Sequence, residues 1–89
     1  MKILELSSIL KEEGYIYYIN RYTAIAKIEI MTNIISFPLS FTIEMNPFGV
    51  KTIDLDPLPK EIDYPVIPLS KSLKEFISLM DKEGSLPQT

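Results

Sequence analysis

Acidic side chains gather around a proline-rich stretch in the second half of the sequence. Asp54, Asp56, Glu61 and Asp63 follow one another closely, and carboxylate oxygens bind hard cations such as Mg²⁺ and Ca²⁺. No glycine lies between them, whereas aspartate-rich calcium loops require one. These carboxylates are more simply explained as hydrating a strand and a loop. We predict no metal and no cofactor, and keep a small-molecule or metal-ion binding domain using residues 54–64 as the alternative function.

Groups that could act as a nucleophile or a general base are few. The sequence has no cysteine and no histidine, which removes the thiolate nucleophile and the commonest general base. The Ser-x-x-Lys spacing from Ser8 to Lys11 falls in a predicted helix rather than in a turn that would expose the serine. Ser70 and Ser72, on either side of Lys71, are better explained as helix caps. We therefore predict that the protein is not an enzyme.

The charge pattern argues against nucleic acids as direct partners. The net charge is −3, and the 9 basic residues are scattered along the chain, whereas phosphate binding needs several cations together. The tyrosines between positions 15 and 22 could stack on bases, but they lack basic neighbours. No apolar run approaches the ~18–20 residues of a membrane span, and the N-terminus lacks the pattern of a signal peptide. We expect a cytoplasmic protein with no membrane partner.

One strand organises the rest of the chain. From Ile34 to Met45 apolar and polar residues alternate, which is typical of a strand with one buried face. Residues 22–30 alternate in the same way. A four-residue loop from Met31 to Ile34 would pair residues whose numbers sum to 65, such as Ile28 with Phe37. In this register the missing N–H of Pro38 points beyond the end of the fourth strand and breaks no ladder bond.

A second hairpin is indicated by turn residues. Asn46-Pro47-Phe48-Gly49 has the composition of a type I turn with Gly49 at positive φ. This predicts a three-residue loop with a bulge at the glycine, and pairs whose numbers sum to 96, such as Ile43 with Ile53. Residues Tyr15 to Ile19 are β-formers and are predicted to be the first strand, paired with residues 22–30.

Helices are predicted at both ends of the sheet. Ile3, Leu6, Ile9 and Leu10 have helical spacing over residues 2–13, and Gly14 would end that helix. The C-terminal helix has a second apolar stripe, with a capping box at its start and a glycine, Gly84, at its end. The stripe and the capping box consist of Leu73, Phe76, Ile77 and Met80, and of Ser72 and Glu75.

The predicted fold is a two-layer α+β domain. A four-stranded antiparallel meander has an N-terminal and a C-terminal helix on its buried face, in the order α-β-β-β-β-α. Residues 1–84 form the single domain. Within it, residues 57–69 are an extended proline-rich arm, because its prolines disfavour helix and interior strand. Residues 85–89 are predicted to be a mobile tail.

The outer face of this sheet is the predicted binding surface. Tyrosines and aliphatic residues in one patch are typical of protein interfaces, and the arm adds a Pro-x-x-Pro spacing from Pro65 to Pro68 that suits docking. The predicted contact residues are Ile16, Tyr18, Thr23, Ile25, Lys27, Tyr64, Pro65 and Pro68. We predict a non-catalytic protein-protein interaction module, a small accessory subunit or adaptor that binds another protein or itself.

Overall fold

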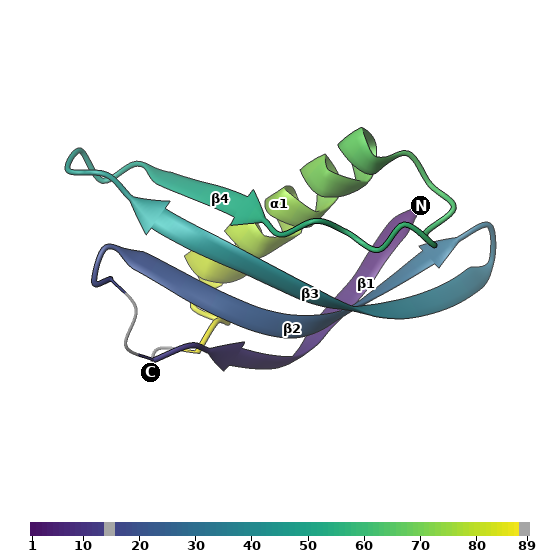
Figure 1. Cartoon of the computed structure of the whole chain (residues 1–89), viewed down its shortest axis with the longest axis horizontal. Helices are drawn as coiled ribbons and strands as arrows, with labels where there is room; N and C mark the ends of the chain where they lie inside the picture. Colours follow the sequence, from purple (N-terminus) through teal and green to yellow (C-terminus); the bar gives the residue numbers. More distant parts are fainter. Residues whose placement is uncertain (14–15, 88–89) are drawn as a thin grey trace.

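The computed structural model describes residues 1–13 and 16–87, and it begins with a strand rather than a helix. The elements are β1 (Lys2–Lys11), β2 (Ile19–Ile30), β3 (Asn33–Met45), β4 (Lys51–Leu55) and α1 (Val66–Glu83). The strands form one antiparallel sheet in the order β1-β2-β3-β4, with α1 against one face (Figure 1). The predicted antiparallel sheet and C-terminal helix are present. The predicted order α-β-β-β-β-α is wrong, because the observed order is β-β-β-β-α.

Two bulges explain why β1 resembles a helix in sequence. Its register with β2 shifts between Ile3 and Glu5, and again between Ser7 and Leu10. Each bulge inserts an extra residue, so the spacing of inward side chains grows from two to three. Ile3, Leu6 and Ile9 therefore all face the core, Leu6 at 7% exposure. That spacing also fits the face of a helix, and this coincidence misled the prediction.

The segment predicted as the first strand is mostly a turn. Tyr15, together with the Gly14 predicted as a helix cap, lies outside the described residues. Residues 16–18 form a turn in which the Ile19 N–H donates to the Ile16 carbonyl at 2.9 Å. Ile19 is already the first residue of β2. The prediction is wrong because residues 2–11 supply the strand that pairs with β2.

The β2–β3 hairpin is tighter than predicted. Met31 and Thr32 have φ of 48° and 71°, so they form a two-residue turn with both residues left-handed. Paired residues sum to 63 rather than 65, and Ala26 lies opposite Phe37. A shift by two residues keeps every side chain on its predicted face, because strand side chains alternate. The predicted pairs are wrong, but the predicted buried face is right.

We expect the double substitution Met31→Asn and Thr32→Gly to stabilise the protein. A left-handed conformation costs an ordinary residue roughly 1–2 kcal/mol, and Asn-Gly is the preferred pair for this turn. A gain of about 1 kcal/mol would raise Tm by about 4–8 °C in a domain of this size. Thermal unfolding followed by circular dichroism measures it. A lower Tm would contradict the two-residue turn and favour the longer loop.

The β3–β4 hairpin has the predicted register. Phe41 pairs with Leu55 and Ile43 with Ile53, and Gly49 has a φ of 82°. The Asn46 side-chain oxygen accepts hydrogen bonds from the N–H groups of Phe48 and Val50 at 2.9 and 3.0 Å. This hairpin agrees with the sequence because its turn residues demand one geometry.

Pro38 lies inside β3 without breaking the ladder. The Ser40 carbonyl accepts from the Asp56 N–H at 2.9 Å, so Ser40 faces the β4 side. Pro38, two residues away, faces the same side, as predicted. β4 has ended at Leu55. Pro59 and Ile62, in the segment that follows β4, lie near Pro38 and border the same small hollow.

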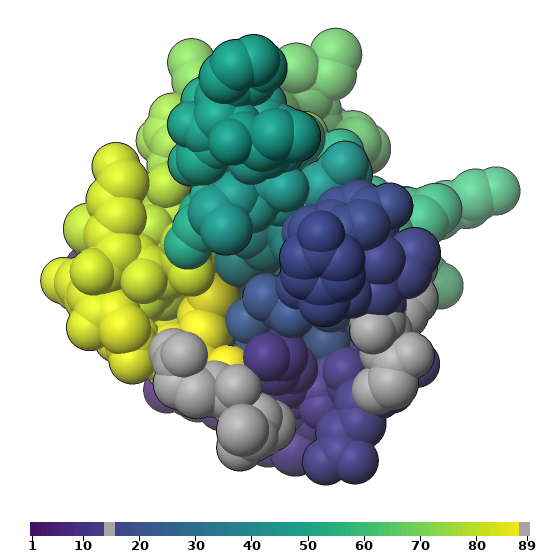
Figure 2. All heavy atoms as spheres, turned by 90° about the vertical axis from the view of Figure 1, so that its left-hand side faces the viewer, coloured from purple at the N-terminus to yellow at the C-terminus, as the bar shows by residue number. Residues whose placement is uncertain are grey.

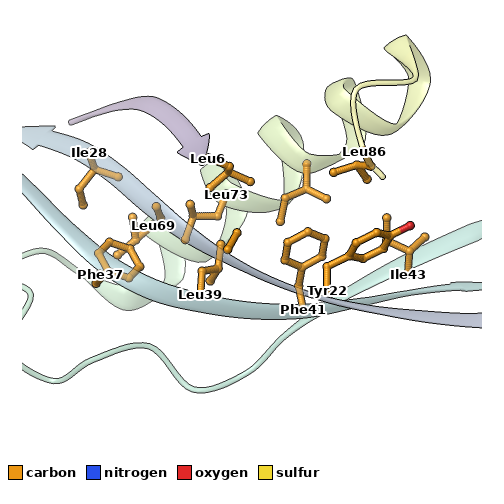
Figure 3. Close-up of a cluster of buried hydrophobic side chains, with 13 residues drawn as sticks. Leu6, Tyr22, Ile28, Phe37, Leu39, Phe41, Ile43, Leu69, Leu73 and Leu86 are labelled. Carbon is orange, nitrogen blue, oxygen red and sulfur yellow. The ribbon is translucent and has the colours of Figure 1, made fainter. Parts of the chain in front are cut away.

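The core lies between the sheet and α1. Tyr22 of β2 stacks on Phe41 of β3, with ring centroids 5.1 Å apart and an interplanar angle of 20°. Leu73 and Ile77 of α1 are fully buried beneath the strands, as Figure 3 shows for Leu73. The buried side chains are Leu6, Tyr22, Ala24, Ala26, Ile28, Phe37, Leu39, Phe41, Ile43, Leu69, Leu73, Ile77 and Leu86.

Tyr22 makes stability depend on pH in the alkaline range. Burial raises the pKa of Tyr22 above its usual value; the Asp81 carboxylate raises that pKa further and the Lys51 ammonium lowers it. The folded state therefore favours the neutral phenol. Its contribution is complete below the ordinary tyrosine pKa of about 10 and is lost as the pH rises through the folded pKa.

We expect Tyr22→Phe to remove this part of the alkaline destabilisation. Urea unfolding of both proteins at about pH 8 and about pH 11 measures it. The wild type should lose more free energy of unfolding between the two pH values than the variant does. Equal losses would contradict a raised pKa for Tyr22.

Helix α1 begins earlier than predicted. Pro65 is its N-cap residue, and no side chain caps the helix, so the predicted capping box is wrong. The Leu69 N–H donates to the Pro65 carbonyl at 3.2 Å. Pro68 is tolerated because a residue in the first turn has no carbonyl partner for its N–H. Residues 66–69 of the predicted extended arm are therefore helical.

The end of α1 agrees with the sequence. Gly84 adopts the left-handed C-cap conformation with φ of 73°. Leu86, in the segment predicted to be a mobile tail, is buried at 4% exposure; residues 88–89 lie outside the described part of the chain. Within the part of the chain that the structure describes, no helix combines the length and apolar character that a membrane span requires.

Candidate protein-interaction surface

Two loops meet at one end of the sheet and expose large apolar side chains. The turn before β2 and the β3–β4 loop are joined by a hydrogen bond from the Met45 N–H to the Tyr18 carbonyl at 3.0 Å. Figure 2 looks onto this end, where the two loops project next to each other in dark blue and teal. We call this surface the aromatic tip. Its residues are Ile16, Tyr17, Tyr18, Met45, Phe48 and Val50.

The aromatic rings of the tip are unusually exposed. Tyr17 is 93% exposed and Phe48 is 91% exposed. Tyr17 also meets Tyr18 edge to face, with ring centroids 5.3 Å apart and an interplanar angle of 86°. Isolated apolar residues on a surface are ordinary, but a contiguous group of this size is typical of binding surfaces.

A hollow of about 520 Å³ lies between the two loops. Tyr17 and Tyr18 form one side, and residues 44–47 with Gly49 form the other. Of the described residues that line it, Glu44 carries the charge. The chemistry of this hollow is therefore that of an apolar side chain entering between rings, with a carboxylate at the rim.

The local sequence fixes the shape of the tip. Asn46 holds the backbone of the β3–β4 loop through its side-chain oxygen, and Pro47 fixes one φ angle. This geometry places Phe48 at the outermost point of the loop, away from the core. Because the backbone is already held, a partner would lose little loop entropy on binding there.

The predicted outer-face patch is divided between two places. Ile16 and Tyr18 belong to the aromatic tip, whereas Ile25 lies in the middle of the sheet between Ser7 and Pro38. Ile19 begins β2, and Ile25 lies six residues further, about 20 Å at a rise of ~3.3 Å per residue. The predicted contact between Ile16 and Ile25 is wrong, because β1 occupies the place beside β2.

The remaining outer-face residues have ordinary surroundings. Thr23 lies opposite Leu10 of β1 and Ser40 of β3. Lys27 forms an ion pair with Glu5, with 3.1 Å between Nζ and Oε1. Ile25 is 38% exposed. The sheet centre is therefore open to solvent but less apolar than the tip.

The predicted arm residues lie near the start of α1. Tyr64 is half-buried and packs against the core. Pro65 and Pro68 are exposed, and the two residues between them are helical. The Pro-x-x-Pro spacing therefore does not form the extended ligand for which such a motif is known.

The acidic cluster is partly neutralised by Arg21. The guanidinium contacts both carboxylate oxygens of Asp56, with 3.3 Å from Nη1 to Oδ1. Its Nε lies 3.2 Å from Glu12 Oε2. Arg21 thus joins the ends of β1 and β4 across the outer face. Within residues 1–13 and 16–87 no three His, Cys, Asp or Glu side chains are placed to hold a metal ion.

Four tip residues are absent from the site predicted from sequence. They are Tyr17, Met45, Phe48 and Val50. Phe48 carried a readable signal, because it follows Pro47 in a turn whose outer positions must face water. Tyr17 carried none, since the strand predicted for residues 15–19 places it in the core.

Comparison with known proteins places the chain in a family. No curated protein and no solved structure matches it. The model of the BB_0187 family matches residues 1–82, a range that spans the four strands and all of α1 except its last residue. The chain therefore belongs to the BB_0187 family.

Proposed function

We propose that this protein is a non-catalytic protein-interaction module, a small accessory subunit or adaptor, that contacts another protein or a second copy of itself through the aromatic tip. The observation that carries the proposal is the near-complete exposure of Tyr17 and Phe48 on two adjoining loops. Tyrosine, phenylalanine and methionine are enriched in protein interfaces.

The energetic argument concerns water at the tip. Burying one large apolar side chain stabilises a complex by roughly 1.5–3 kcal/mol. Two aromatic rings held on fixed loops around a hollow can supply the central anchors of an interface. The tyrosine hydroxyls can hydrogen-bond to the partner at the rim of the contact.

The non-catalytic part of the proposal rests on the chemistry available. The sequence contains neither histidine nor cysteine, and the tip offers tyrosine hydroxyls and Glu44. A general base with a pKa near neutrality is the usual requirement for acid–base catalysis. Binding therefore explains this surface better than a reaction does.

Site-specific photo-crosslinking in the native host tests the proposal. A photoreactive phenylalanine analogue replaces Phe48, and in a control it replaces Lys60, an exposed residue in the segment between β4 and α1 (Figure 1). We expect one defined adduct from position 48 that the control lacks, and that Tyr17→Ser weakens. The adduct's mass distinguishes another protein from a second copy.

Two outcomes would contradict the proposal. The first is no adduct at position 48 beyond the control. The second is an adduct that Tyr17→Ser leaves unchanged, because Tyr17 lines the same hollow. Circular dichroism of each variant checks that the fold is retained.

A further inference from the structure

The outer edge of β4 is an unused row of backbone hydrogen-bonding groups. β4 pairs with β3 on one side. Val50 and Asp56 direct backbone groups toward β3, since the Val50 carbonyl accepts from Asn46 and the Asp56 N–H donates to Ser40. Backbone direction alternates along a strand. Ile53 and Leu55 therefore direct theirs away from β3, and no described residue pairs with these backbone groups.

A groove runs between this edge and α1. Its volume is about 560 Å³, and it is lined by Ile53 of β4 and by Val66 and Ile67 of α1, among other residues. Val66 is 62% exposed and Ile67 is 82% exposed. The groove therefore has an aliphatic wall beside free backbone groups. Strand addition uses this combination of backbone pairing and side-chain pockets.

The rim of the groove is basic although the protein is acidic. Lys51, Lys71 and Lys74 line the groove with Glu75, in a chain whose net charge is −3. Lys51 Nζ is held 2.7 Å from Asp81 Oδ2. Lys71 and Lys74 lie one turn apart on α1, so their ammonium groups are free to meet a negatively charged ligand.

We propose that this groove binds an extended acidic segment of another protein, which adds a strand to the free edge of β4. Glutamate or aspartate side chains of the segment meet Lys71 and Lys74, and aliphatic side chains at alternate positions lie against Val66 and Ile67. The site is separate from the aromatic tip and does not depend on the function proposed for it.

Charge selects this occupant over a second copy. In a symmetric dimer each edge would meet the same edge of its partner, and the same lysines would face one another. The other edge strand of the sheet, β1, carries two bulges, which are a common means of blocking strand addition. β4 is therefore the edge suited to an acidic segment.

Fluorescence anisotropy with the full-length protein tests the proposal. The probe is a short fluorescein-labelled peptide that alternates glutamate with valine, compared with one that alternates lysine with valine. We expect saturable binding of the acidic probe only. Lys71→Glu with Lys74→Glu should weaken it about tenfold or more. The matched control, Lys2→Glu with Lys60→Glu, makes the same change in net charge at two exposed positions and should have little effect.

Backbone pairing has its own readout. A probe N-methylated at alternate residues cannot form the ladder and should bind at least about tenfold more weakly. Amide exchange at Ile53 and Leu55 should slow when the unmodified probe is present. Absent binding, equal binding of the N-methylated probe, or equal loss in both double variants would overturn the proposal. Phe48→Ala should not change binding of this probe, which separates this test from that of the aromatic tip.

Discussion

Phe41→Ala should lower the free energy of unfolding by about 3–5 kcal/mol. Phe41 is fully buried at the centre of β3 and stacks on Tyr22 with ring centroids 5.1 Å apart. A chain of this length has a total stability of roughly 4–13 kcal/mol. The variant would therefore lose a large part of that stability. Urea unfolding followed by circular dichroism measures the loss.

Phe48→Ala is the matched control for this prediction. It deletes the same ring, but from a side chain that is 91% exposed, and surface substitutions usually change stability by less than about 0.5 kcal/mol. The two variants should differ by several kcal/mol. Similar losses would contradict the assignment of Phe41 to the core and Phe48 to the surface.

Phe48→Ala combined with Tyr17→Ala should weaken association with the crosslinked partner by about thirtyfold or more. Truncating one central aromatic residue of an interface commonly costs about 2 kcal/mol or more, and tenfold in affinity corresponds to about 1.4 kcal/mol. Both side chains are almost wholly exposed, so the free protein should keep its stability. Biolayer interferometry with the purified partner, or sedimentation for self-association, gives the affinity.

Ile25→Glu separates this surface from the sheet centre. Ile25 lies on the outer face between Ser7 and Pro38, and it belongs to the contact surface that the sequence predicts. With the tip as the contact, this charge change should leave affinity almost unaltered. A loss at Ile25 that equals or exceeds that of the tip variant would show that the open face of the sheet is the contact.

The sheet was most predictable where turn chemistry and alternation agree. The alternation in residues 34–45 predicts β3, and Gly49 fixes the β3–β4 register. Alternation decides which face a side chain occupies, but it cannot detect a shift by two residues. The β2–β3 register differs for this reason, since Met31 and Thr32 adopt a conformation that their residue types do not favour.

β1 was not predictable from spacing alone. Ile3, Leu6 and Ile9 recur every third residue because of two bulges, and a helix face has nearly the same spacing. Bulges depend on pairing with β2, which is information from a distant part of the chain. Once residues 2–11 are misplaced, residues 15–19 are needed as a strand, and the first error causes the second.

The candidate surface inherited that error only in part. Ile16 and Tyr18 were selected as neighbours of Ile25 on a strand, yet they lie beside the β3–β4 loop. Their exposure was predicted correctly while their neighbours were not. Contacts between separate loops depend on the full topology, whereas exposure in a turn is local.

Hydrogen–deuterium exchange of the protein, alone and with the partner bound, tests the central claim most directly. The aromatic tip predicts that slower exchange on binding is concentrated in residues 16–19 and 45–50, the two loops joined by the Met45 and Tyr18 backbones. Protection centred on residues 23–27 of β2, with the two loops unchanged, would contradict it.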